Sequence, residues 1–258
     1  MRKVIWTSLC AILCAMPALA APADAAGVDF AGVEAVLGRP PMRSGDVYRY
    51  GFPRSDLAVT VDGVRIEPAL ALGGWVAFTS VAEPAQGVVM GDLVLTEAEV
   101  EPVMKSLLAG GVAVTALHNH LLRATPPTLY MHIAGHGDAV ELAKTIRSAL
   151  EHTKTPLEAG RAASRPSPSP TQPLDIARIE DAIGSKGRLN GGVYQFSAPR
   201  SGSVSHEGMT IPAAMGTANA MNFQPTGRGR AVIAGDLVAQ AGEVDSMIET
   251  LLSHGVEV

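Results

Sequence analysis

Cysteine is scarce in this sequence. The 258 residues contain two cysteines, Cys10 and Cys14, and both lie in an apolar segment near the N-terminus. Neither follows a small residue, as a bacterial lipid-attachment cysteine does, so we expect no lipid anchor. If this segment is removed on export, the remaining chain has no disulfide, no thiolate nucleophile and no thiolate metal ligand.

Long hydrophobic runs are also lacking beyond the N-terminus. Arg2 and Lys3 precede an apolar run from Val4 to Ala21, and Ala18-Leu19-Ala20 has the small-residue pattern of a cleavage site. The pattern predicts a signal peptide over residues 1–20 and an exported protein, periplasmic or extracellular. The alternative is an uncleaved anchor, but the run is shorter than the roughly 20 apolar residues that span a bilayer. No second run is long enough, so we expect no transmembrane segment in the mature chain.

Charged residues make up only 17% of the chain, whereas 47% of it is hydrophobic, which is ample for a core. Loss of Arg2 and Lys3 leaves 18 basic residues against 25 acidic ones, a net charge of −7. An acidic surface repels phosphate backbones, so nucleic acid is not an expected partner. The sequence has no Gly-x-Ser-x-Gly elbow, Walker loop or dinucleotide fingerprint, so we expect no nucleotide cofactor.

An internal repeat is what the sequence does contain. The segment Val89–Val94 resembles Ile233–Val238, and the same offset relates Glu99 to Glu243. With small shifts the match extends upstream to these pairs: Asp29 and Asp175, Glu34 and Glu180, Gly38 and Gly184, Val47 and Val193, Arg54 and Arg200. The two halves of the chain therefore read as related copies.

The domain organisation follows from this repeat. We expect a first repeat domain over residues 27–152, a Pro/Ser-rich linker over 153–173 and a second, incomplete repeat domain over 174–258. The linker contains the run Arg165–Pro170, in which proline alternates with serine, as in an extended spacer. Val258 aligns with Val114, just before a histidine motif, so we expect the second copy to be truncated.

Hydrophobic periodicity predicts an α+β fold of tandem related domains. Each has a β-α-β-β-α core unit plus an additional N-terminal helix and strands. In the first copy, apolar residues at helical spacing over 100–108 precede predicted strands at 112–117 and 128–134 and a closing helix at 138–150. An Asp62-Gly63 turn between β-branched residues predicts a hairpin. A split β-α-β arrangement is compatible with this order.

Four of the seven histidines lie within nineteen residues: His118, His120, His132 and His136. Because strand side chains alternate, His118 and His120 share a face, and so do His132 and His136. Neutral imidazole is the commonest protein ligand of metals, and a site with three nitrogen ligands and an open position is typical of catalytic zinc. Asp138 or Asp92 could orient a ligand histidine or complete the coordination.

Two alternatives remain open for this cluster. The histidines could end their strands by bonding to backbone or to the Asn119 amide, or one of them could act as a general base without metal. Elsewhere, Gly91-Asp92 and Gly235-Asp236 read as turns that cap helices. We expect Arg54 and Arg200 to lie in surface turns, with anion binding as the alternative. We expect Trp75 and Phe78 to belong to the core, with a wall on which a ligand stacks as the alternative.

Several of these segments resemble the repeated domain of the LppY/LpqO family of exported bacterial proteins. The resemblance rests on Gly91–Val94, Gly111-Val112, Ala116–His120 and the stretch from Pro127 through Met131-His132 to Asp138. It implies export and tandem domains of unknown function, some of them in lipoproteins, and it implies no activity.

From the sequence we therefore expect an exported soluble protein with a site for a divalent transition metal, and zinc is the metal that we expect there. The predicted ligands are His118, His120 and His132, with His136 or Asp138 as a fourth partner. Metal-assisted hydrolysis is the chemistry that such a site would support. The alternative is a non-enzymatic envelope protein that binds a small molecule or another envelope component. A carboxylate beside the histidines would favour the enzyme.

Overall fold

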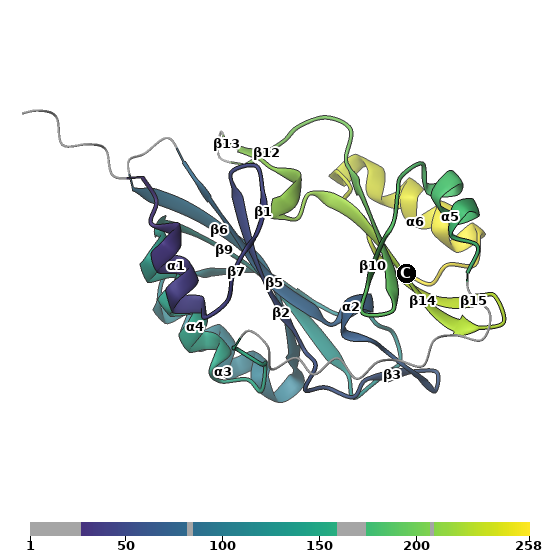
Figure 1. Cartoon of the computed structure of the whole chain (residues 1–258), viewed down its shortest axis with the longest axis horizontal. Coiled ribbons are helices and arrows are strands. Elements are labelled where there is room, and N and C mark those ends of the chain that lie inside the picture. Colours follow the sequence, from purple (N-terminus) through teal and green to yellow (C-terminus); the bar gives the residue numbers. More distant parts are fainter. Residues whose placement is uncertain (1–26, 82–84, 159–173, 207–208) are drawn as a thin grey trace, which may run out of the picture.

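The computed structural model describes residues 27–81, 85–158, 174–206 and 209–258, which form an α+β fold (Figure 1). The predicted signal peptide and most of the predicted linker lie outside the described residues. A six-stranded antiparallel sheet dominates the first copy, and its order is β1-β2-β5-β6-β9-β7. These strands are β1 (Met42–Ser44), β2 (Val47–Pro53), β5 (Gly73–Ser80), β6 (Gln86–Thr96), β9 (Thr128–Asp138) and β7 (Ala113–His118).

The core unit of this sheet is a split β-α-β motif. β9 lies between β6 and β7 and is antiparallel to both, so β6 and β7 run in the same direction. Helix α3 (Glu97–Ala109) connects β6 to β7, and α4 (Ala139–Leu150) follows β9. Asp138 accepts hydrogen bonds from the first turn of α4 and thereby caps this helix. The β-α-β-β-α order expected from the sequence is thus present.

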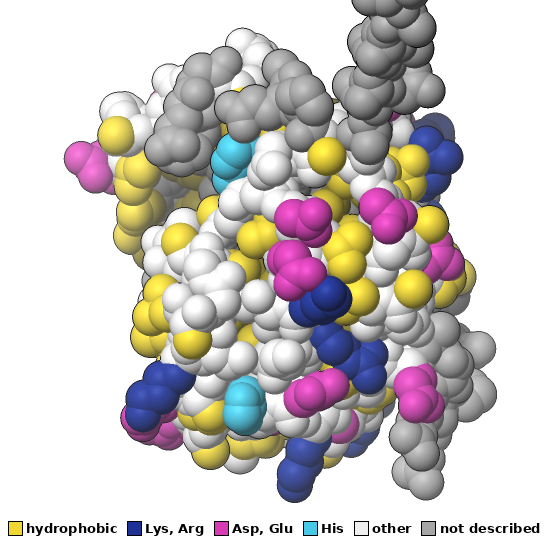
Figure 2. Space-filling model, turned by 90° about the vertical axis from the view of Figure 1, so that its left-hand side faces the viewer, with side chains coloured by type: hydrophobic (Ala, Val, Ile, Leu, Met, Phe, Trp, Pro, Cys, Tyr) yellow, Lys and Arg dark blue, Asp and Glu magenta, His cyan; other side chains and the backbone are white. Residues whose placement is uncertain are grey.

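Helices α1 (Phe30–Leu37), α3 and α4 cover one face of this sheet (Figure 1). The main core lies between them, because alternate residues of each strand project to that side. Figure 2 shows this side of the molecule, where acidic and basic side chains are scattered among apolar ones. Phe78 belongs to this core, whereas Trp75 projects to the other face of the sheet and is half-buried.

Short elements border the sheet. The predicted hairpin is present as β3 (Thr60–Val61) and β4 (Val64–Arg65), and Asp62 and Gly63 in its turn both have positive φ. Strand β8 (Ala124–Thr125) pairs with β3. Helix α2 (Pro68–Ala71) follows the hairpin and, as shown below, contacts the second copy.

The second copy repeats the N-terminal part of the first. Its four-stranded sheet has the order β10-β11-β14-β15. Its elements are α5 (Ile176–Ile183), β10 (Arg188–Asn190), β11 (Val193–Pro199), β12 (Val204–His206), β13 (Met209–Ile211), η1 (Ala213–Met215), β14 (Ala218–Gly227), β15 (Arg230–Asp236), η2 (Ala241–Glu243) and α6 (Val244–Ser253). Asp29 and Asp175 cap α1 and α5, and both helices end at a left-handed glycine, Gly38 or Gly184.

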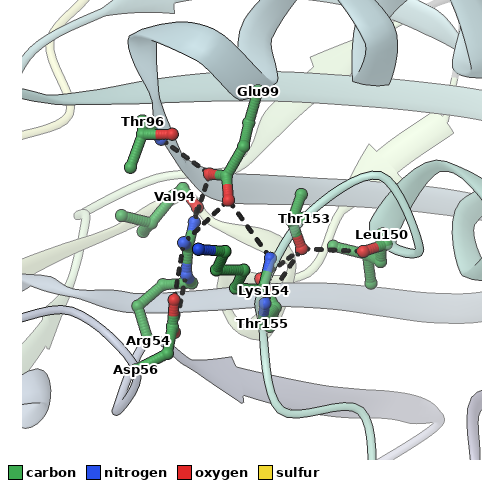
Figure 3. Close-up of polar contacts among 9 residues, drawn as sticks. All are labelled: Arg54, Asp56, Val94, Thr96, Glu99, Leu150, Thr153, Lys154 and Thr155. Carbon is green, nitrogen blue, oxygen red and sulfur yellow. Dashed lines mark hydrogen bonds and ion pairs between the residues drawn. The ribbon is translucent and has the colours of Figure 1, made fainter.

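One arginine–glutamate ion pair occurs in both copies and is buried in the first. Arg54 is 1% exposed and binds both carboxylate oxygens of Glu99, the carbonyl of Val94 and the carboxylate of Asp56 (Figure 3). Arg200 repeats the contact with Glu243. Each glutamate also accepts a backbone hydrogen bond at the start of its own helix. The donor is the N–H of Thr96 for Glu99 and the N–H of Gln240 for Glu243. The surface turn expected for Arg54 was wrong, because this guanidinium joins strand, loop and helix.

The second sheet packs against the face of the first sheet that the helices leave open. Val94 and Tyr130 of the first sheet share a buried apolar cluster with Val193 of β11. Polar side chains of β11 and β14 donate to the carbonyls of Arg65, Ala69 and Leu70 at and beside α2. Figure 1 shows the result, in which α1, α3 and α4 lie on one side, α5 and α6 lie on the other, and both sheets lie between.

Candidate metal centre

A row of side chains crosses the first sheet on the face that meets the second copy. Across neighbouring strands, Trp75 pairs with Asp92, and Asp92 pairs with His132. Directly paired residues of antiparallel strands project to the same face, so these side chains are lateral neighbours. Asp92 lies in the middle of β6, and the turn with a helix cap that the sequence suggested was wrong.

A register shift in β7 brings His118 to this face. Val114 pairs with Ile133 and Ala116 with His132, so Thr115 is an extra residue on β7. Val114 packs towards the helices, and simple alternation would send His118 the same way. Because the extra residue reverses the alternation, His118 pairs with Tyr130 and lies on the same side as His132.

His120 reaches the cluster from the loop that follows β7. Its ring stacks on Tyr130 with 4.0 Å between ring centroids, and it stacks on His118 with 4.8 Å between centroids. Tyr130 is buried and its hydroxyl donates to the carbonyl of Ala71 at 2.8 Å, so it gives His120 a fixed platform. This role of Tyr130 was not predicted from the sequence, although Tyr130 and His132 lie two residues apart on one predicted strand and so share a face.

The three histidines converge. A ligand nitrogen from each of His118, His120 and His132 lies within 4.8 Å of the other two, and the Nε2 atoms of His118 and His132 are 3.1 Å apart. Nitrogen ligands about 2.0–2.1 Å from a tetrahedral zinc are roughly 3.3 Å from one another. One pair therefore has close to the spacing of zinc ligands, and a ring nitrogen of His120 lies within 4.8 Å of both.

A carboxylate lies beside the histidines. Asp92 Oδ2 is 3.7 Å from His132 Nε2, while Asp92 Oδ1 is buried and has no hydrogen-bond partner among the described residues. Burial raises the pKa of Asp92, and the charge of Asp236 acts in the same direction, while the two nearby histidines and Arg49 oppose the shift. Burial of a carboxylate oxygen without a partner costs free energy, so binding a cation or a water molecule there would be favourable.

The second copy supplies a further carboxylate. Asp236 is the equivalent of Asp92, and it lines the same cavity as Asp92, His120 and His132. Burial lowers the pKa of His120 to about 4, and the other two histidines add to this effect, while the negative charge of Asp236 opposes it. His120 is therefore neutral near pH 7, the form that binds a metal. The sequence showed the Gly-Asp repeat but gave no sign that the second aspartate faces the first copy's histidines.

Two predicted ligands lie away from this group. His136 pairs with Val88, four residues along β9 from His132, which is roughly 13 Å at strand spacing. Asp138 pairs with Gln86 and caps α4. The structure thus brings together three of the four histidines, and Asp92 rather than Asp138 accompanies them.

The cluster opens into a cavity of about 1720 Å³ between the two sheets. Trp75 and Arg49 form part of its wall, and the Arg49 guanidinium lies 3.6 Å from the centre of the Trp75 ring. Arg49 also donates to the carbonyl of Ala214 at 2.9 Å, so one arginine contacts both copies. Its place between the two copies was not predictable from the sequence.

The fold and site define an α+β protein with two related copies, in which one copy holds a histidine cluster that the other partly covers. The chain belongs to the family described as Domain of Unknown Function (DUF1259), which it matches over residues 31–152 and 177–258. The two matched segments agree with the repeat seen in the sequence. No curated protein and no solved structure matches the chain. Among the described residues, no helix is both long and apolar enough to cross a membrane.

Proposed function

We propose that His118, His120 and His132 bind one divalent transition metal, and that zinc fits them best. The observation that carries the proposal is the convergence of three ring nitrogens within 4.8 Å on a strand face that also presents Asp92. Three neutral imidazoles and an open fourth position are the ligand set of many catalytic zinc sites. The cavity gives a small molecule access to that position.

The neighbouring carboxylate favours an enzyme over a passive binding protein. In metal-assisted hydrolysis a water oxygen attacks an electrophilic carbon or phosphorus, and the bond to the leaving group breaks. Asp92, 3.7 Å from a ligand histidine, would accept the proton of that water and pass it to the leaving group. We therefore infer a metal-dependent hydrolase, with a ligand-binding envelope protein as the alternative.

Export and a closer family assignment belong to the same proposal. The N-terminal pattern supports export to the periplasm or the extracellular space. Both cysteines lie in the expected signal peptide, so the exported chain would have no thiolate to compete with the histidines for metal. The resemblance of Ala116–His120 and Met131-His132 to the LppY/LpqO domain supports the same location. Residues of both copies line the cavity, which supports a function that requires both copies together rather than each copy alone.

Metal content tests the proposal directly. The untagged protein should contain about one metal per chain by elemental analysis, and a His118→Ala/His120→Ala variant should contain none. His136→Ala is the matched control, since this histidine lies on the same strand as His132 but outside the cluster. Absence of metal from the unaltered protein after incubation with zinc, copper or manganese would overturn the proposal. Retention by the double variant would do the same.

A further inference from the structure

Arg49 is a half-buried cation whose hydrogen-bonding capacity the protein leaves mostly unused. Its guanidinium has five N–H donors, and one bond to Ala214 is the hydrogen bond that the structure assigns to it. Within the described part of the chain, no carboxylate oxygen lies within 4.0 Å of its nitrogens. Burial lowers the pKa of Arg49 to about 10, with Asp92 opposing the shift, so the charge is retained at neutral pH but is poorly solvated.

The position of this guanidinium is fixed. The Arg49 Cζ atom lies 3.6 Å from the centre of the Trp75 ring, and Arg49 Nη1 donates a hydrogen bond to the carbonyl of Ala214. A guanidinium with free N–H groups can bind a carboxylate or phosphate through two parallel hydrogen bonds. Arg49 and Trp75 both line the cavity, so an anion in the cavity can reach Arg49.

The charge of the cavity wall differs from that of the whole chain. The chain has 20 basic and 25 acidic residues, whereas the described residues that line the cavity include four basic and three acidic ones, apart from Arg43, whose guanidinium lies over Tyr48 on the helix-covered face. The four basic residues are Arg49, Arg65, Lys186 and Arg188, and the acidic ones are Glu67, Asp92 and Asp236. An acidic protein with a cationic cavity attracts small anions to that cavity.

We propose that Arg49 binds an anionic group, a carboxylate or a phosphate, of the molecule that occupies this cavity. The inference rests on the proposed function and names the substrate class for that site. Trp75, on whose ring Arg49 packs, lies two strands away from His132, which is roughly 10 Å at the spacing of strands in a sheet. The anionic group is therefore a remote handle on a small molecule, several bonds away from the bond that lies over the histidines.

Trp75 provides the test. The chain has two tryptophans, Trp6 and Trp75, so the full chain with Trp6→Phe reports fluorescence from Trp75 alone. The metal-free protein is titrated with inorganic phosphate and, separately, with acetate at constant ionic strength. A saturable change with either anion is expected, and the stronger of the two identifies the group. Arg49→Gln should raise the dissociation constant about tenfold or more, and Arg49→Lys should do so by a smaller factor.

Arg43→Gln is the matched control, since the Arg43 guanidinium also lies over an aromatic ring, that of Tyr48 at 4.6 Å, but on the face of the sheet that α1 covers. It should change the dissociation constant less than about threefold. No saturable response to either anion, or equal losses in the Arg43 and Arg49 variants, would overturn the proposal. If Arg49→Gln fails to fold, as judged by thermal unfolding, Arg49→Lys decides the outcome. His118→Ala/His120→Ala should still bind the anion, so failure of the metal site is seen separately.

Discussion

The Nε2 atoms of His118 and His132 lie 3.1 Å apart, although the two residues belong to different strands and are separated by 14 positions in the chain. One ring must donate from Nε2 and the other must accept at Nε2, so two neutral rings in this contact have opposite tautomers. The contact holds both rings on the same side of the sheet. A metal ion would replace the shared proton without a large rearrangement, which is the kind of preorganisation that favours binding.

Asp92→Asn should weaken metal binding without abolishing it. Asp92 lies next to His132 but beyond bonding distance, so it acts on the metal through the ligand histidine and through its charge. We expect about one metal per chain at saturation, with an affinity about 10-fold to 100-fold lower, measured by competition with a chromophoric chelator. Complete loss of metal would instead make Asp92 a direct ligand.

The same substitution should have the opposite effect on the metal-free fold. Burial raises the pKa of Asp92, so at neutral pH the folded state keeps a carboxylate ionised against its preference. Asparagine removes that charge with almost no change in shape. The thermal midpoint of the metal-free variant should therefore rise, and a fall would show that the ionised carboxylate has a stabilising partner in the metal-free protein.

Asp236→Asn tests whether the second copy contributes to the site of the first. Its carboxylate acts electrostatically on Asp92 and His120, so it should also stabilise a bound cation. We expect the metal affinity to fall by roughly threefold to tenfold, a modest change for a charge that is not a ligand. Asp245→Asn, on the outer helix α6, should leave the affinity unchanged. Equal affinities in both variants would make the site a property of the first copy alone.

Much of the fold could be predicted because it depends on local patterns. The caps at Asp138 and Glu99, the Asp62-Gly63 turn and the β-α-β-β-α order follow from side chains close in sequence. The split motif needed one further fact, that β9 inserts between β6 and β7. Strand pairing is a long-range choice that periodicity does not reveal.

The site was only partly predictable, and the extra residue Thr115 is the reason. Strict alternation places His118 with Val114 on the helix-covered face, away from His132. The sequence carries no signal for the bulge that reverses this. Conversely, His132 and His136 share a face as predicted, but strand length separates them. Arg49 and Asp236 join the site through the packing of one copy on the other, which a single sequence does not encode visibly.

The repeated ion pair offers a comparison of equivalent arginines in different surroundings. Arg54 is almost fully buried with Glu99 and Asp56, whereas the Glu243 side chain that Arg200 binds is 43% exposed. Arg54→Met leaves two carboxylates without their cation and should lower the free energy of unfolding by about 3–5 kcal/mol. Arg200→Met should lower it far less, because water replaces the contact. Urea denaturation of the full chain measures both, and equal losses would contradict the argument from burial.

The Arg54–Glu99 pair should also make stability depend on pH in acid. Burial opposes ionisation of Glu99, but hydrogen bonds from Arg54 and from the backbone of Thr96 and Lys154 outweigh it, so the pKa of Glu99 lies below its usual value. A group whose pKa is lower in the folded state stabilises the fold above its unfolded pKa, near 4.3, and loses that contribution as the pH falls through the folded value. The second copy follows the same rule, because hydrogen bonds from Arg200 and Gln240 lower the pKa of Glu243 to about 2.

Glu99→Gln isolates this contribution, since glutamine keeps the shape of the side chain and does not titrate. At pH 7 the variant should be less stable than the unaltered protein in urea. As the pH falls below about 4.3, Glu99 takes up a proton first in the unfolded chain and only at a lower pH in the folded protein, because its folded pKa is lowered. The difference between the two proteins should therefore shrink from about pH 4.3 downwards and level off once the pH lies below the folded pKa. Other carboxylates titrate in both proteins and cancel in the comparison. A difference that stays constant from pH 7 to pH 2 would mean that the charge of Glu99 adds nothing to the stability of the fold.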